Sequence, residues 1–199
     1  MDVNGRYKTI KKCRISESGE LTKVLHLGNQ PLANSLKSNK KDSEAKYPLT
    51  ISYCKESSLL QLNETIDKSV LFDQYVWVTG TSQTAQDYAK MFAERLIKKA
   101  IPNKDDLIIE IASNDGTFLK PLLSKGFKNV VGVDPAKNIA VIANKKGIKT
   151  LPEFWSSSLA NQIVSDNGPA KVIFARNVIP HVSALLDVIK GIEIVLKDD

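Results

Sequence analysis

The residues that could do chemistry gather behind an apolar segment near the middle of the chain. Positions 107–112 read Leu-Ile-Ile-Glu-Ile-Ala, which predicts a strand buried on both faces. Ser113, Asn114, Asp115 and Gly116 follow. They supply polar side chains, and a glycine where the backbone can meet a ligand. The start of the next helix would offer free N–H groups to a polar group.

A second acid lies at the end of the next apolar run. Asp134 follows Val130–Val133 and stands 24 residues after Glu110 (134 − 110). An acid at this place grips ribose hydroxyls in nucleotide-binding α/β folds. The alternative is that Asp134 caps a helix that starts near Ala136. Glu110 lies inside the apolar run, where burial is costly without a partner.

The elements that must position these residues alternate. Strands are predicted at 107–112, 129–133, 147–151 and 171–175, and helices at 117–125, 136–146, 156–165 and 183–196. This alternation predicts a parallel sheet with helices on its faces. Residues 1–83 lack apolar periodicity and predict a small β-rich module, residues 84–102 a linking helix, and residues 103–199 the α/β domain.

Composition excludes several classes of protein. The 199 residues are 42% hydrophobic and 25% charged, as expected of a globular chain. No run approaches the ~18 apolar residues of a membrane span, and the N-terminus lacks the apolar core of a signal peptide. The net charge of +6 comes from scattered lysines without an arginine cluster. We expect a cytoplasmic protein with neither a nucleic acid nor a membrane as its partner.

Four stretches in order resemble a known family. They are residues 13–34, which include Leu-His-Leu-Gly-Asn-Gln-Pro-Leu-Ala-Asn; residues 47–62; residues 71–82; and residues 110–116 together with 133–136 and 175–182. The chain resembles S-adenosylmethionine (SAM)-dependent sugar C-methyltransferases, which act on nucleotide-linked keto-deoxysugars. The resemblance covers essentially the whole chain and implies a class I methyltransferase sheet of the Rossmann-like type, behind a zinc-binding domain.

The resemblance also implies roles for residues. The cofactor-binding residues would be Glu110, Ala112, Asn114, Asp115, Gly116, Asp134 and Asn177. Tyr75 and His181 would bind the nucleotide-sugar, and His181 is the candidate catalytic residue.

Each of these roles has a plainer alternative. Gly116 would serve only as a turn glycine, and Asn114 and Asp115 would only cap the helix. Tyr75 would pack in a core beside Phe72 and Trp77, and His181 would cap a helix or lie on the surface.

Two departures from the family pattern matter. The family has two Cys-x-x-Cys pairs in its first domain, whereas this chain keeps Cys13 and Cys54 and has Ser16 and Ser57 at the second positions. A serine hydroxyl is a poor zinc ligand, so we expect little bound zinc. His26 could be a third zinc ligand, but nothing in its spacing requires that role.

The second departure is length. Family members continue for about as long again, so the sheet is expected to be incomplete and the family's catalytic base to lie beyond residue 199. We therefore expect a fragment that is inactive alone and self-associates through an exposed sheet edge. Methylation of another small acceptor, or SAM binding without turnover, are the alternative functions.

Overall fold

The computed structural model describes residues 6–72 and 74–196. Residues 1–5, 73 and 197–199, which the predicted domains 1–83 and 103–199 include, lie outside the described residues. The chain divides into two compact units, residues 1–72 and 73–199. None of the described helices is long and apolar enough to cross a membrane.

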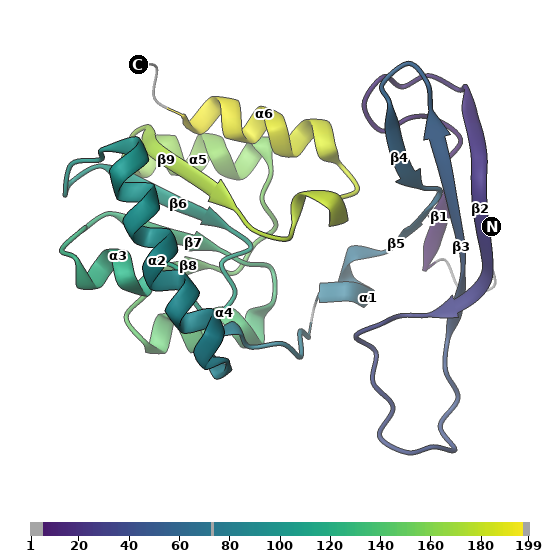
Figure 1. The fold of residues 1–199 in the computed structure, drawn as a ribbon, viewed down its shortest axis with the longest axis horizontal. Coiled ribbons are helices and arrows are strands. Elements are labelled where there is room, and N and C mark those ends of the chain that lie inside the picture. Colours follow the sequence, from purple (N-terminus) through teal and green to yellow (C-terminus); the bar gives the residue numbers. More distant parts are fainter. Residues whose placement is uncertain (1–5, 73, 197–199) are drawn as a thin grey trace. The chain divides into compact units, whose positions relative to one another are not determined.

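The first unit is built from short antiparallel strands (Figure 1). β2 (Leu21–Pro31), β3 (Lys46–Cys54) and β4 (Leu59–Leu62) form a sheet in the order β2-β3-β4, and β1 (Tyr7–Thr9) pairs with β5 (Glu64–Ile66). α1 (Lys68–Phe72) closes the unit. Alternation decides which face of the second half of β3 is buried, because Thr50, Ser52 and Cys54 are buried while Ile51 and Tyr53 are only half-buried.

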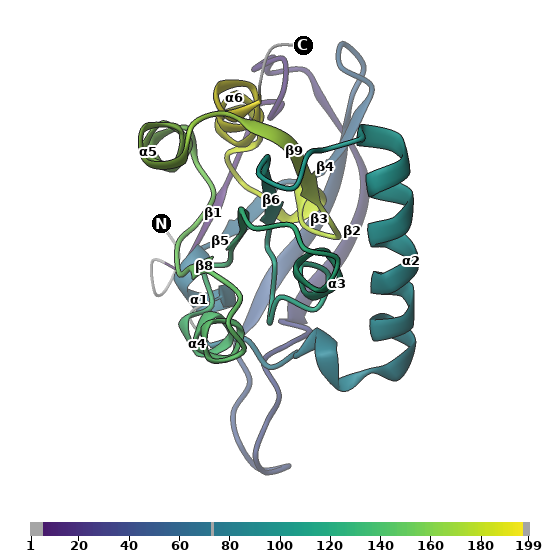
Figure 2. The ribbon, with the colours of Figure 1, turned by 90° about the vertical axis from the view of Figure 1, so that its left-hand side faces the viewer.

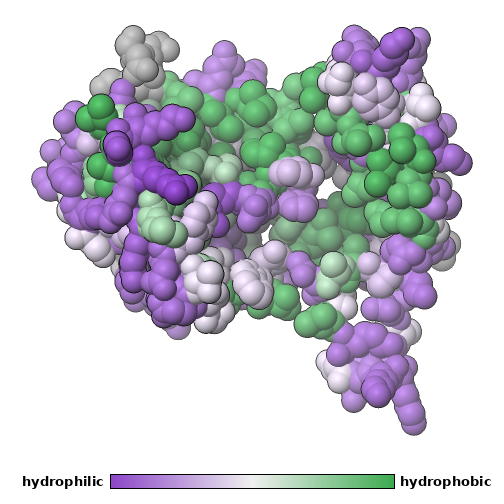
Figure 3. Space-filling model, in the orientation of Figure 1, coloured by the Kyte–Doolittle hydropathy of each residue, from purple (hydrophilic) through white to green (hydrophobic). Residues whose placement is uncertain are grey.

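This small sheet leaves apolar side chains in contact with solvent. The exposed set in β2 and β4 is Val24, Leu25, Leu27, Leu60 and Leu62. Figure 3 shows hydrophobic surface over the first unit. A unit of this size buries little apolar area, so contacts other than apolar burial must contribute to its stability.

The second unit is a three-layer α/β domain. Its sheet is parallel in the order β8-β7-β6-β9. The strands are β6 (Leu107–Ile111), β7 (Val130–Val133), β8 (Thr150–Leu151) and β9 (Ala170–Ala175). The helices are α2 (Gln83–Ala100), α3 (Lys120–Ser124), α4 (Lys137–Lys145), α5 (Ser157–Asn167) and α6 (Leu185–Val195), with short 3₁₀ turns η1 (Thr79–Thr81) and η2 (Ile179–His181). The order confirms the predicted Rossmann-like sheet of parallel strands with flanking helices behind a small β-rich module.

Two apolar cores lie on the two faces of the sheet. The first packs α5 and α6 on side chains such as Ile109, Ile111 and Val133. The second packs α2, α3 and α4 on side chains such as Ile108 and Val130. Figure 2 shows α2 and α3 on the opposite side of the strands from α5 and α6. Alternate residues of β6 therefore face different cores, and α2, predicted as a linking helix, belongs to the second unit.

β8 is shorter than the strand predicted at 147–151. Gly147 and Ile148 instead belong to the turn that ends α4, because Gly147 N donates to Asn144 O and Ile148 N donates to Ala143 O. The ladder to β7 begins after this turn, where Lys149 O and Leu151 O accept hydrogen bonds. The side-chain amide of Asn144 bonds Thr150 N and O on the other edge of β8.

Candidate functional site

The carboxyl ends of three parallel strands meet at one edge of the sheet. Ile111 lies level with Val133 of β7 and with Ala175 of β9. The residues that follow, Ala112, Asp134 and Arg176, therefore leave the sheet side by side. The strand order reverses between β6 and β9, and open α/β sheets bind ligands at such a switch point.

The turn after β6 has an unusual backbone. Ala112 has φ 55°, Asn114 has φ 51° and Gly116 has φ 76°. Left-handed geometry is uncommon for alanine, and such strain clusters at functional sites. A Cβ on Gly116 would lie 2.6 Å from Ile148 Cδ1. Position 116 therefore requires glycine, because it packs closely against Ile148 and has a positive φ.

Asp134 holds this turn through both carboxylate oxygens. Oδ2 accepts a hydrogen bond from Asn114 N at 2.8 Å, and Oδ1 accepts one from Ala136 N at 3.0 Å. Burial raises the pKa of Asp134, and the two N–H donors oppose that rise. The carboxylate thus fixes the turn and holds Ala136, the residue that precedes α4. Each oxygen keeps a further lone pair for a ligand hydroxyl.

Asn114 and Asp115 bind the preceding segment of the same unit. Asn114 Oδ1 accepts from Thr79 N at 2.8 Å, and its Nδ2 donates to Trp77 O at 3.0 Å. Asp115 accepts from Gly80 N at 3.2 Å. These bonds fix the 77–80 segment beside the turn.

Asp115 is fully buried and has two further partners. Thr117 Oγ1 donates to it at 2.7 Å, and Lys146 Nζ lies 2.6 Å from Oδ2. Burial raises the pKa of Asp115, but hydrogen bonds from Lys146 and Thr117 outweigh it, so the pKa lies below its usual value. Asp115 therefore holds the turn together through these contacts, a role that its position in the sequence did not reveal.

Glu110 is a buried acid that has one carboxyl oxygen without a hydrogen-bond partner. The residue is 2% exposed, and its Oε2 has no partner in the described part of the chain. Burial raises its pKa well above the usual value; Arg176 opposes this rise, whereas Asp134 and Asp115 add to it. Ser113 Oγ is likewise buried without a partner. Orphaned polar groups of this kind need an explanation, and a bound polar ligand supplies one.

Arg176 is the cation that balances Glu110. Its guanidinium carbon lies 3.0 Å from the ring centroid of Phe118, with the rings of Tyr88 and Phe92 at 5.6 and 6.0 Å. Burial lowers the pKa of Arg176, and Glu110 raises it. Arg176 and Phe174 are two residues apart in one extended segment, so both face α2. Sequence reasoning did not assign Arg176 a role, although a charged residue at the end of an apolar strand is a usable signal.

The remaining predicted site residues lie around this edge. Asn177 follows β9, is exposed and has φ 51°. His181 ends η2 and is exposed. Tyr75 is tied by its backbone to the amide of Asn138 in α4, with Tyr75 N to Oδ1 at 3.3 Å and Nδ2 to Tyr75 O at 2.9 Å. Asn138 was not foreseen, because its partner is 63 residues away.

The serine-substituted cysteine pairs do not fit a zinc ion. In the described residues, no three His, Cys, Asp or Glu side chains gather as a metal site. His26 Nδ1 instead lies 3.0 Å from Thr50 Oγ1, which in turn bonds Glu64. Two thiols and two hydroxyls lack the four good donors of a structural zinc site.

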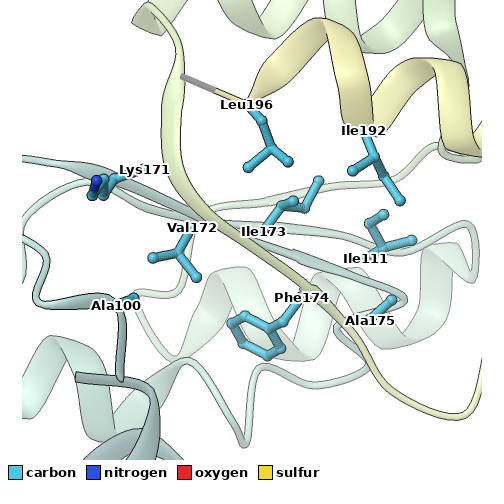
Figure 4. Close-up of a pocket in the computed structure, with 9 residues that line it drawn as sticks. All are labelled: Ala100, Ile111, Lys171, Val172, Ile173, Phe174, Ala175, Ile192 and Leu196. Atoms are coloured by element: carbon cyan, nitrogen blue, oxygen red, sulfur yellow. The ribbon is translucent and has the colours of Figure 1, made fainter. Parts of the chain in front are cut away.

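An apolar hollow of about 300 Å³ lies along β9, away from these polar groups. Figure 4 shows the residues that line it, which include Val172, Ile173, Phe174, Ile192 and Leu196. Leu196 makes a parallel bridge to Ala170 at one end. The hollow belongs to the sheet edge, and Lys171 is the charged residue among the mostly apolar residues that line it.

The chain is similar in sequence to known proteins. Residues 13–72 match a family described as "Putative zinc binding domain". The chain is 27% identical over 194 residues to the C-methyltransferase NovU of Streptomyces niveus. This match covers 96% of this chain and 46% of NovU. The chain is a relative of a C-methyltransferase. This confirms the resemblance drawn from the sequence, and the chain spans about half the length of this relative.

Solved structures with a similar fold include two methyltransferases. One is a SAM-dependent methyltransferase from Anabaena variabilis, 24% identical, with a TM-score of 0.44 over 54% of this chain and 46% of that one. The other is magnesium protoporphyrin IX methyltransferase from Synechocystis, solved with bound SAM, 15% identical, with a TM-score of 0.43 over 56% and 54% of the two chains.

Proposed function

We propose that this chain is the cofactor-binding part of a SAM-dependent C-methyltransferase that acts on a nucleotide-linked keto-deoxysugar. The observation that carries the proposal is the strained turn after β6, held by Asp134 and flanked by the orphaned carboxyl of Glu110. The similarity to NovU supports methylation at carbon.

The residues at this edge suit the parts of SAM. Asp134 would accept hydrogen bonds from the ribose hydroxyls through its remaining lone pairs. Glu110 would face the cationic ammonium of the methionine end, which would supply the missing partner of Oε2. Once bound, the cofactor supplies an electrophilic methyl group. Asn177 and Tyr75 would orient cofactor and sugar beside it.

Carbon methylation also needs a proton to be removed next to the ketone. His181 is exposed at the end of η2, after β9. Histidine is the side chain that most often transfers protons in catalysis. We assign it the proton-handling role among the described residues of this unit, and the nucleotide-sugar is the acceptor by resemblance alone.

Calorimetric titration with SAM and with its demethylated product tests the cofactor assignment. Asp134→Asn keeps one carbonyl oxygen for the turn but removes the charge. Losing a hydrogen bond to a charged group costs roughly 1.5–3 kcal/mol, so affinity should fall by about tenfold or more. Asp166→Asn in the exposed part of α5 is the matched control. Equal affinities for wild type and Asp134→Asn, with thermal melting showing both folded, would refute the role of Asp134.

SAM binding without turnover is the second candidate. The missing zinc donors at Ser16 and Ser57 favour it, since they show that one inherited site has lost its ligands. Methyl transfer from labelled SAM to keto-sugar nucleotides would separate the two functions. Binding with transfer supports the enzyme, and binding without transfer in the full-length protein supports the second candidate.

A further inference from the structure

Two turns of the first unit bring four small side chains together. Cys13 Sγ lies 3.1 Å from Ser57 Oγ, and Ser16 Oγ lies 3.6 Å from Cys54 Sγ. The two turns share one shape, because the residue four places after each cysteine is left-handed: Glu17 has φ 57° and Ser58 has φ 56°. The fold has thus kept the paired turns although zinc does not fit between them.

Each sulfur atom lies against the turn that carries the other cysteine. Cys13 Sγ contacts Ser57 of the 54–57 turn, and Cys54 Sγ contacts Ser16 of the 13–16 turn. The two thiols therefore belong to one cluster of side chains. A disulfide needs the sulfurs to approach to about 2.05 Å, so the serine hydroxyls must rotate aside when it closes.

Cys13 is the better nucleophile of the two. Its Sγ accepts a hydrogen bond from Ile15 N at 3.4 Å as well as its contact with Ser57. Cys54 Sγ, by comparison, contacts Ser16 Oγ at the longer distance of 3.6 Å, and hydrogen bonds to a sulfur favour its thiolate form. Thiolates, not thiols, attack disulfides.

We propose that Cys13 and Cys54 form a redox-active dithiol that closes to an intramolecular disulfide by exchange with a small-molecule disulfide such as glutathione disulfide. Serine at positions 16 and 57 leaves each cysteine with one possible partner inside the chain, because the chain has only two cysteines. The pair thus stands where the metal ligands of the related domains would be.

The exchange runs in two balanced steps. The Cys13 thiolate attacks one sulfur of glutathione disulfide, whose S–S bond breaks, and one glutathione thiolate leaves. Cys54 then loses its proton and attacks the Cys13 sulfur of the mixed disulfide, and the second glutathione thiolate leaves. Two electrons pass from the cysteines to glutathione disulfide, which becomes two glutathione molecules.

The cover over the pair is thin. Cys13 and Cys54 are 2% and 0% exposed, but their neighbours Lys12, Ile15 and Lys55 are exposed. Local opening of one short turn is enough to admit a tripeptide, and such turns open at far lower free energy than the whole unit. The rate of oxidation is therefore expected to follow this opening.

The test uses the full chain equilibrated with mixtures of reduced and oxidised glutathione. After acid quenching and alkylation in denaturant, mass spectrometry counts the free thiols. We expect both thiols to be lost together, so that the count falls from two to zero. The mass of the chain should fall by two hydrogen atoms, and the chain should run as a monomer on a non-reducing gel. Two free thiols throughout the series, a disulfide only between chains, or about one zinc per chain that protects both thiols would overturn the proposal.

Matched variants identify the roles of the two sulfurs. Cys54→Ser should stop at a mixed disulfide of Cys13 with glutathione, whereas Cys13→Ser should leave Cys54 largely unmodified. Ser57→Ala removes a hydrogen bond that stabilises the reduced Cys13, so the equilibrium should move toward the disulfide by about tenfold. An unchanged equilibrium in Ser57→Ala, or equal reactivity of the two single-cysteine chains, would contradict the assignment of Cys13 as the nucleophile.

Discussion

The ion pair between Lys146 and Asp115 allows the role of the turn to be tested without any ligand. Lys146 Nζ lies 2.6 Å from Asp115 Oδ2; the Asp115 side chain is 0% exposed and that of Lys146 is 44% exposed. Replacing Lys146 by methionine leaves a buried carboxylate with its bonds to Thr117 and Gly80 only. The perturbation therefore removes a charge partner and keeps the length of the side chain.

The magnitude follows from the exposure of the two partners. Breaking a fully buried pair costs about 3–5 kcal/mol, whereas an exposed pair contributes up to about 1 kcal/mol. One partner here is buried and the other nearly half-exposed, so we expect Lys146→Met to lower the free energy of unfolding by about 1.5–3 kcal/mol at pH 7. Lys145→Met, at the neighbouring exposed lysine of α4, is the control and should cost under about 1 kcal/mol.

The pH dependence gives a second measurement. The pKa of Asp115 is lowered in the folded state, so its contribution is present above the unfolded pKa of about 3.9 and is lost as the pH falls through the folded pKa. In Lys146→Met that loss should begin at a higher pH, and the difference from wild type should shrink below about pH 4.

Urea unfolding at pH 4 and pH 7 measures both effects, with Asp115→Asn and the double variant completing a cycle. In the Asp115→Asn background, Lys146→Met should cost less than about 0.5 kcal/mol. An equal cost for Lys146→Met and Lys145→Met at pH 7 would refute the argument.

Three further predictions concern other features. Glu110→Gln should raise the free energy of unfolding at pH 7 by about 1–3 kcal/mol. Burial raises the pKa of Glu110 in the folded state, so the wild type loses stability as the pH rises above the unfolded pKa of about 4.3. Urea unfolding at pH 4 and pH 7 measures this, with exposed Glu94→Gln as the control, and a gain that does not depend on pH would contradict the prediction. Ser16→Cys combined with Ser57→Cys should bind about one zinc per chain by elemental analysis, while stoichiometric zinc in wild type would contradict the poor fit of its donors. The 199-residue chain should self-associate through the apolar edge of β9, and Val172→Lys should reduce this; light scattering that shows a monodisperse wild-type monomer at high concentration would exclude it.

The fold could be predicted from the sequence because its signals are local. Apolar β-branched runs at 107–111 and 130–133 made the strands readable, and alternation with helices made the sheet parallel. The β8 strand was predicted too long because hydrogen bonds to Asn144 O and Ala143 O hold Gly147 and Ile148 in the turn that ends α4. The buried side chain of Ile148 suits such a turn as well as a strand, so the apolar pattern alone does not separate the two.

The candidate site was less readable because its decisive contacts are long-range. Lys146 and Asp115 are 31 residues apart, and Asn138 and Tyr75 are 63 apart. The stacking of Arg176 on Phe118 depends on how two elements pack, which one sequence does not show. The left-handed backbone of Ala112 was also hidden, since alanine rarely adopts it. The prediction that these residues bind a cofactor stays a prediction.

The polar groups at this edge fall into two kinds, and the difference bears on function. Asn114 and Asp115 are satisfied by protein partners and hold the turn in place. Glu110 Oε2 and Ser113 Oγ are buried beside the same turn and have no partner in the described residues. Burying such groups costs stability, and a strained backbone adds to that cost. The hydrogen bonds and the ion pair of the first kind must offset this cost, which explains why the buried Asp115 carboxylate and its half-exposed partner Lys146 stand next to unsatisfied groups.

A ligand that supplies the missing partners should therefore stabilise the unit. A ligand that binds only the folded state stabilises by RT ln(1 + [L]/Kd), about 2.7 kcal/mol when its concentration is 100 times Kd. SAM carries a cationic ammonium for Glu110, so its effect on melting temperature should shrink in Glu110→Gln, while the variant itself melts higher. A gain in stability joined to a loss of ligand response is the signature of a group kept for binding at the expense of folding. Equal ligand-induced shifts in wild type and Glu110→Gln would show that Glu110 faces no ligand.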